Sequence, residues 1–214
     1  MERLGYTVEL AGVCCGRAHI SKGFLTDARR LARDGIARLR QAAADGVPVL
    51  GLEPSCLLTL ADEWPELVPG PAAKAVAGVA ELAEVWIGRA IRDSGLSLEP
   101  HAGAAVFHPH CHQRALVGPG GTAEALGLVP GLSVTTLDAG CCGMAGAFGY
   151  EKEHYDLSVR IAELGVLPAV ARHPDAMLVA TGTSCRHQLR DLTGRHPAHP
   201  VEVLAAALPA GPEA

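Results

Sequence analysis

Two stretches of this 214-residue chain resemble each other: Gly5-Tyr6-Thr7-Val8-Glu9-Leu10-Ala11-Gly12-Val13-Cys14-Cys15-Gly16 and Gly131-Leu132-Ser133-Val134-Thr135-Thr136-Leu137-Asp138-Ala139-Gly140-Cys141-Cys142-Gly143. Each stretch is predicted to be a short strand that runs into a Cys-Cys-Gly turn. An internal repeat indicates one structural unit used twice, so the two halves of the chain are expected to share an architecture.

The similarity between the two halves extends beyond these turns. Each copy continues with a helical stretch, an apolar strand and a turn that carries one cysteine. In the first copy these are 25–44, 47–52 and Cys56, and in the second they are 151–172, 176–180 and Cys185. The same order in both copies is difficult to obtain by chance.

The alternation of strands and helices predicts the fold class. It favours an α/β fold of two pseudo-repeated, Rossmann-like lobes with mainly parallel sheets. Apolar residues at helical spacing also predict a helix over 71–93, and residues 104–107 are predicted as a strand that leads to Cys111. Ligands of such sheets gather at the carboxyl ends of the strands, and the cysteines are expected there.

The predicted domain organisation follows the repeat. The first lobe is expected over residues 1–95, incomplete at its N-terminus, and the second over 104–208. A linker over 96–103 joins them, because this stretch carries Gly, Ser, Pro and His without apolar periodicity. Residues 209–214 are predicted to be a frayed tail.

The composition excludes several classes of protein. With 49% apolar and 19% charged residues, the chain is globular rather than disordered. A net charge of −5 argues against a nucleic-acid partner, and no apolar run is long enough for a transmembrane segment. Seven cysteines without a signal sequence are typical of metal ligands or catalytic thiols in a reducing compartment. A cytoplasmic location is expected, with any membrane contact made through partners.

The second half offers four thiols from three successive strand ends: Cys111, Cys141, Cys142 and Cys185. Four thiolates suit either a [4Fe–4S] cluster or a tetrahedral zinc ion. Adjacent cysteines reach two irons of a cluster more readily than two corners of one tetrahedron, and the cluster is therefore favoured over zinc. No residue is predicted to be catalytic.

The first half offers only three thiols, Cys14, Cys15 and Cys56. Three outcomes stay open for them. They bind a second cluster with a non-cysteine ligand such as His19, they bind zinc, or they bind no metal.

Several histidines lie beside these cysteines. His108, His110 and His112 alternate around Cys111, whereas His19 and His187 follow cysteines by a few residues. His19, His110, His112 and His187 are candidates for alternative ligands or for hydrogen bonds to a cluster sulfur. The other reading is that they are polar residues at strand ends.

These motifs carry a resemblance that covers nearly the whole chain. The chain is similar to the cysteine-rich CCG domain found in heterodisulfide reductases and in the iron–sulfur subunits of glycolate and lactate oxidases. It resembles even more closely the C-terminal region of long fusion proteins, in which an FAD-linked oxidase domain is joined to an iron–sulfur region. The matching segments are Cys14 to Gly23, Gly51 to Cys56, His110 to Gln113, Gly140 to Gly146 and Gly182 to Gln188.

The resemblance implies electron transfer. In the family, a flavin domain oxidises a 2-hydroxy acid such as D-lactate, glycolate or D-2-hydroxyglutarate, and the iron–sulfur region passes the electrons to a quinone or a redox protein. The resemblance thus implies FAD on a partner domain or subunit, and a chain that is a subunit or the C-terminal part of a longer protein. Without a flavin partner it is not expected to turn over substrate.

Two alternatives remain beside this reading. One is thiol–disulfide chemistry of the heterodisulfide reductase type, and the other is a structural zinc protein. The fuller family pattern ends in Cys-x-x-Cys, but Thr59 and Gln188 stand at the last position of the two motifs here. This departure disfavours the two-lobed clusters of the heterodisulfide enzymes.

Overall fold

The computed structural model describes residues 1–210. It divides into two compact units, Met1–Trp86 and Ile87–Ala214, so the division lies inside helix α6 (Ala83–Ser94). The lobe boundaries predicted from the sequence stay a prediction. Of the predicted tail, residues 211–214 lie outside the described part of the chain.

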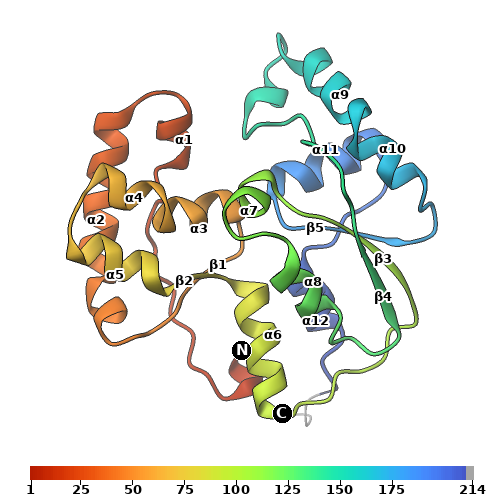
Figure 1. Cartoon of the computed structure of the whole chain (residues 1–214), viewed down its shortest axis with the longest axis horizontal. Helices are drawn as coiled ribbons and strands as arrows, with labels where there is room; N and C mark the ends of the chain where they lie inside the picture. Colours follow the sequence, from red (N-terminus) through yellow and green to blue (C-terminus); the bar gives the residue numbers. More distant parts are fainter. Residues whose placement is uncertain (211–214) are drawn as a thin grey trace. The chain divides into compact units, whose positions relative to one another are not determined.

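The first unit is mainly helical around a small parallel sheet (Figure 1). Its elements are η1 (Glu2–Leu4), α1 (Arg17–Ser21), α2 (Leu25–Ala44), β1 (Val49–Gly51), α3 (Pro54–Ala61), α4 (Glu63–Leu67), α5 (Pro71–Val79), β2 (Ala80–Leu82) and the beginning of α6.

Helix α2 has the bounds that the apolar spacing predicts, Leu25–Ala44, and its apolar face forms the core of the first unit. Trp64 of α4 is fully buried against this face. A Cβ atom on Gly35 of α2 would lie only 2.2 Å from the Trp64 ring, so the glycine makes room for the indole. The same indole N–H donates to the carbonyl oxygen of Cys15 at 2.8 Å and ties the Cys-Cys turn to the core.

Two sequence predictions are wrong in the first unit. The helix predicted over 71–93 is interrupted by β2, which pairs in parallel with β1 and satisfies the backbone groups along one of its edges. The strand predicted ahead of Cys14 does not form, and residues 5–13 run as irregular chain. The equivalent strand of the second unit pairs with a central strand, and residues 1–86 contain no counterpart of that central strand.

The second unit contains a three-stranded parallel sheet in the order β4-β3-β5, with β3 between the other two (Figure 1). Its elements after α6 are β3 (Gly103–His108), α7 (Cys111–Leu116), α8 (Gly120–Leu126), β4 (Leu132–Thr136), η2 (Phe148–Tyr150), α9 (Tyr155–Leu164), α10 (Val166–Ala171), β5 (Met177–Ala180), α11 (Thr183–Thr193) and α12 (Pro200–Ala206).

Strands β3 and β5 form the buried centre of this unit. Val106, Phe107 and Val179 are at most 1% exposed, as expected for strands covered on both faces. The helix predicted over 151–172 is two helices, α9 and α10, which meet at Gly165. A Cβ atom at Gly165 would lie 2.9 Å from the backbone nitrogen of Gly140, so the helices break where the chain before Cys141 passes closest.

The predicted α/β fold with parallel sheets is confirmed. The predicted turns at Cys56 and Cys185 are instead the first turns of helices α3 and α11. This difference does not move either cysteine from the carboxyl end of its strand. No helix within residues 1–210 combines the length and the apolar character that crossing a bilayer requires.

Candidate functional site

Four cysteines lie at the carboxyl ends of the three neighbouring strands of the second unit. Cys111 is the first residue of α7 after β3, Cys141 and Cys142 follow β4, and Cys185 is in the first turn of α11 after β5. Side-chain hydrogen bonds join Cys142 to both Cys141 and Cys185. The structure therefore brings three of the predicted ligands into contact and places Cys111 at the same edge of the sheet.

Burial and mutual hydrogen bonding favour the protonated thiols of Cys141 and Cys142 when no metal is bound. Cys142 and Cys185 are only 4% and 3% exposed. The hydrogen bond with Cys142, followed by burial, raises the pKa of the Cys141 thiol well above its usual range. At Cys142 the hydrogen bond with Cys141 favours the thiolate, but the hydrogen bond with Cys185 and burial outweigh it and raise its pKa to about 12. Binding of a cationic metal centre would have to displace these protons.

The loop after β4 is shaped by close backbone contacts. Gly143 has a φ of +92°, and a Cβ atom there would lie 2.0 Å from the carbonyl oxygen of Ser158 in α9. The same residue donates its N–H to the Cys141 sulfur at 3.3 Å. Amide donors of this kind stabilise thiolates and tune the potential of sulfur-ligated iron.

A buried polar chain fixes the turn between β3 and α7. The His110 backbone N–H donates to the Thr181 hydroxyl at 3.2 Å, and that hydroxyl donates to the side-chain oxygen Oε1 of Gln113 at 2.8 Å. The Gln113 amide in turn donates to the Thr122 hydroxyl at 2.7 Å. This chain links the segment that carries Cys111 to the end of β5. No local sequence pattern marks residues 68 positions apart as hydrogen-bond partners, so the chain could not be predicted from the sequence.

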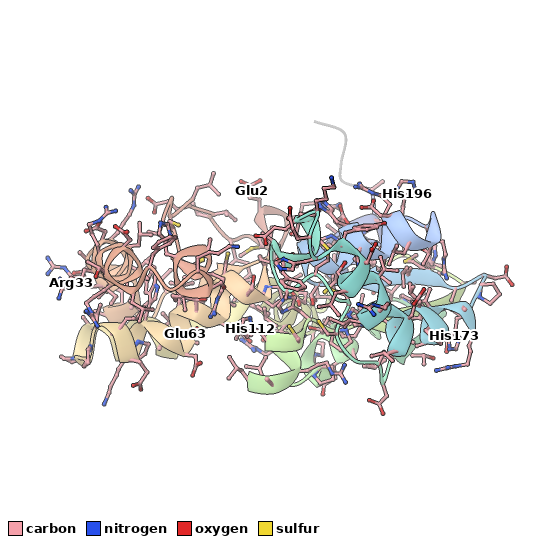
Figure 2. All side chains as sticks on the ribbon, turned by 90° about the horizontal axis from the view of Figure 1, so that it is seen from above. Glu2, Arg33, Glu63, His112, His173 and His196 are labelled. Atoms are coloured by element: carbon pink, nitrogen blue, oxygen red, sulfur yellow. The ribbon has the colours of Figure 1, made fainter. Side chains whose placement is uncertain are left out.

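The histidines near the second site have structural contacts. The His110 ring caps α7 by accepting the His112 N–H at Nδ1, 3.2 Å away, and the Cys111 sulfur lies 3.9 Å from the same nitrogen. The rings of His110 and His112 are 5.6 Å apart, with His112 labelled in Figure 2. His187 hydrogen-bonds through Nδ1 to the Tyr150 hydroxyl. A role of these rings toward a metal centre stays a prediction.

His108 is the most deeply buried histidine of the second unit. It is 1% exposed, and its Nδ1 has no hydrogen-bond partner among the described residues. Burial, with a smaller effect of the Arg114 guanidinium, lowers the pKa of His108 to about 4, and Cys141 partly opposes this. The ring is therefore neutral at pH 7.

Acid is expected to destabilise the protein through His108. The pKa in the folded state, about 4, lies below the unfolded value of 6.5, so the unfolded state binds the proton first as the pH falls. Between pH 7 and 4.5 this group should cost about 2–3 kcal/mol of unfolding free energy. His108→Gln should remove most of that loss in urea unfolding at the two pH values, whereas His101→Gln, at an exposed position, should retain it. Equal losses in both variants would contradict the assignment.

The first unit brings two of its three cysteines into contact. A side-chain hydrogen bond joins Cys15 to Cys56, whereas Cys14 is exposed on the same loop as Cys15. The bond from Cys56, aided by the Arg17 amide and guanidinium, lowers the pKa of Cys15 to about 6. The same hydrogen bond with Cys15, together with burial, raises the pKa of the Cys56 thiol far above its usual range.

Arg17 holds the cysteine-bearing segments of the first unit together. Its amide N–H donates to the Cys15 sulfur at 3.4 Å, and its guanidinium donates to the Thr59 hydroxyl at 2.9 Å. The guanidinium also forms an ion pair with Glu63, which is labelled in Figure 2. The predicted ligand His19 lies in α1, two residues after Arg17. Its buried Nδ1 has no hydrogen-bond partner among the described residues.

Thr59 and Gln188, which stand where the fuller family pattern has its last cysteine, are buried and hydrogen-bonded. Thr59 is fully buried and donates to the Ser55 carbonyl at 2.7 Å. Gln188 is 2% exposed and donates to the Ser158 hydroxyl at 3.3 Å. Both positions therefore serve packing and hydrogen bonding.

The donor set of the second unit consists mainly of cysteine sulfurs. Within the described part of the chain, no three His, Cys, Asp or Glu side chains are arranged to hold a single ion. The second unit instead presents soft sulfur donors from three strand ends, two of them adjacent, and an amide that donates to sulfur. This chemistry fits an iron–sulfur cofactor.

The fold and these sites define a cysteine-rich α/β protein with two Cys-Cys-Gly units. The model of the CCG cysteine-rich domain matches residues 1–61 and 105–190, and the chain belongs to this family. In the second unit, the cysteines that carry the family resemblance are thus the ones that the structure places at the strand ends.

Several curated proteins are similar to this chain. A subunit of the anaerobic glycerol-3-phosphate dehydrogenase of Escherichia coli is 33% identical over 91% of this chain and 49% of its own length. D-2-hydroxyglutarate dehydrogenase of Pantoea ananatis is 30% identical over 95% of this chain and 20% of its own. Lactate utilization protein A of an Exiguobacterium strain is 27% identical over 97% of this chain and 85% of its own. The chain thus spans about half of the first of these proteins and about a fifth of the second.

Proposed function

We propose that this chain is the iron–sulfur electron-transfer part of an FAD-linked dehydrogenase. In this role it accepts electrons from a flavin domain or subunit and passes them to a quinone or a redox protein. The observation that carries the proposal is the gathering of Cys111, Cys141, Cys142 and Cys185 at three neighbouring strand ends. The similarity of nearly the whole chain to parts of dehydrogenases supports it.

The substrate class follows from the chemistry that the relatives share. Glycerol 3-phosphate and D-2-hydroxyglutarate, named for two of them, are both small anions with a secondary alcohol. Lactate, named for a third, has the same group. We propose that the dehydrogenase served by this chain oxidises such an alcohol to a carbonyl at the flavin, with a 2-hydroxy acid as the substrate.

The residues of the second unit are proposed to hold a [4Fe–4S] cluster. Cys111, Cys141, Cys142 and Cys185 supply its four thiolates, and the Gly143 amide donates to one of their sulfurs. A bound cluster of this kind supplies reversible one-electron storage. The burial of Cys142 and Cys185 excludes water from one side of the site, and the exposed Cys111 marks the side open to a partner.

The cellular setting is proposed from the cysteine chemistry. All seven cysteines are free, which is typical of a reducing compartment. A cytoplasmic location follows, with contact to a membrane made through the flavin partner or the acceptor.

The proposal is tested by following the reduction and reoxidation of the chain with its iron–sulfur cluster bound. Protein purified anaerobically and reduced with dithionite should lose visible absorption near 400 nm and regain it when a soluble quinone is added. The variant Cys142→Ser, treated in the same way, should show neither change. If the wild-type absorption is insensitive to both reagents, the chain does not transfer electrons and the proposal is wrong.

A further inference from the structure

His108 is the last residue of β3, the central strand of the second unit, and Cys111 begins α7 three residues later. The Cα atom of His108 is paired with that of Ala180, the last residue of β5. His108 therefore lies at the end of the sheet where the cysteines of this unit follow their strands, although it is not one of the four proposed sulfur ligands.

Strand geometry places the His108 side chain on the face of the sheet that carries buried sulfurs. Val106, two residues earlier in β3, belongs to one hydrophobic cluster with Cys142 and Cys185. Ala180, the strand partner of His108, belongs to the same cluster. Side chains two residues apart in a strand point to the same face, and so do those of directly paired residues. The imidazole thus lies at the end of this cluster from which the cysteine-bearing segments depart.

The His108 imidazole is a buried polar group without a complete set of partners. The residue is 1% exposed, and within residues 1–210 nothing is hydrogen-bonded to its Nδ1. Buried polar atoms are normally paired, and an unpaired one costs free energy. By contrast, the buried side chains of Gln113, Thr122 and Thr181 form a continuous hydrogen-bonded chain. The unpaired nitrogen therefore indicates a partner that the described polypeptide does not provide.

We propose that the Nδ1–H group of His108 donates a hydrogen bond to a sulfur of the cluster held by the second unit. The sulfurs of such a cluster, whether sulfide or thiolate, carry no proton and can only accept. A neutral imidazole carries one N–H group, and a sulfur acceptor at Nδ1 fixes the proton there. The inference rests on the proposed function, because it requires the cluster.

This hydrogen bond gives His108 a role in setting the reduction potential. Reduction adds negative charge to the cluster sulfurs, so a donor stabilises the reduced form more than the oxidised form. The burial of the ring strengthens the effect, because the local dielectric constant is low. When the cluster takes up one electron, the proton stays on Nδ1 and no covalent bond is broken. His108 therefore raises the midpoint potential of the cluster.

The test measures the midpoint potential of the loaded chain in variants of His108. His108→Phe retains an aromatic ring without a donor, so its potential should be about 59 mV lower, which is a tenfold smaller equilibrium constant for one-electron reduction. His108→Asn places an amide N–H near the position of Nδ1 and should restore most of the potential. His101→Phe is the matched control, because His101 is exposed and lies ahead of the opposite end of β3. It should leave the potential unchanged.

Urea unfolding of the metal-free variants separates the donor from a packing role. Asparagine is smaller than the imidazole and leaves a void, so His108→Asn should be less stable than His108→Phe. The proposal predicts the opposite order for the potentials, with the Asn variant closer to the wild type. Potentials that follow the order of stability would overturn the hydrogen bond and leave a packing residue.

The remaining outcomes distinguish this inference from the proposed function. A cluster with the same potential in the wild type and both variants overturns the inference alone, whereas a wild-type chain without iron and sulfide overturns both. If the variants lose the cluster, pulsed EPR of the reduced wild type with isotope-labelled histidine decides. A weak nitrogen coupling supports the hydrogen bond and its absence overturns it. A strong coupling overturns it in favour of histidine bound directly to iron.

Discussion

Replacing Cys142 with serine is expected to remove the iron–sulfur cluster that we propose for the second unit. The Cys142 side chain is hydrogen-bonded to both Cys141 and Cys185 and is 4% exposed, so it lies at the centre of the proposed ligand set. Serine has nearly the same shape but is a poor ligand for iron at neutral pH. Iron content should fall by about four atoms per chain, and the absorption near 400 nm should decrease accordingly.

The matched control for this variant is Cys15→Ser, the same change at the equivalent position of the first unit. It should leave the four irons of the second unit in place. Comparison of the metal-free proteins by thermal unfolding shows whether either change alters the fold itself. A Cys142→Ser protein that retains full iron and an unchanged spectrum would show that the cluster is held elsewhere.

Replacing Gly143 with alanine is expected to produce the largest loss of stability by any single methyl group in the second unit. The new Cβ would lie 2.0 Å from the Ser158 carbonyl oxygen, an atom of the α9 backbone that cannot move aside alone. The φ of +92° adds strain for any residue with a side chain. Strain and overpacking together should cost about 3–5 kcal/mol in urea unfolding.

Gly146→Ala is the matched control for this prediction. Gly146 lies in the same loop with a φ of +71°, but a Cβ atom there meets nothing within 4 Å. Its cost should be limited to backbone strain of about 1–2 kcal/mol. Equal costs for the two variants would show that the loop adapts to the clash and that the contact with α9 is not a structural requirement.

Much of the architecture could be predicted from residue patterns. The amphipathic spacing of α2 fixed both of its ends, and the apolar runs before Cys111 and Cys185 are strands β3 and β5. The rule that ligands gather at the carboxyl ends of parallel strands also placed the four cysteines of the second unit at one sheet edge.

The wrong predictions share a physical cause. The segment ahead of Cys14 has the sequence of a strand, but a strand forms only when a neighbour completes its ladder, and the first unit lacks that neighbour. Strand β2 lies inside a helical pattern because pairing with β1 outweighs local propensity. The break at Gly165 and the Gln113–Thr181 chain depend on contacts between distant residues, which no local pattern encodes.

The proposed iron–sulfur cluster on Cys111, Cys141, Cys142 and Cys185 can be tested by chemical analysis. The most direct measurement is iron, sulfide and zinc analysis of anaerobically purified protein, together with its optical and EPR spectra. We expect about four irons and four sulfides per chain, or more if the first unit also binds a cluster, with a broad band near 400 nm that dithionite bleaches. Stoichiometric zinc without iron or sulfide would contradict it and leave a structural metal protein.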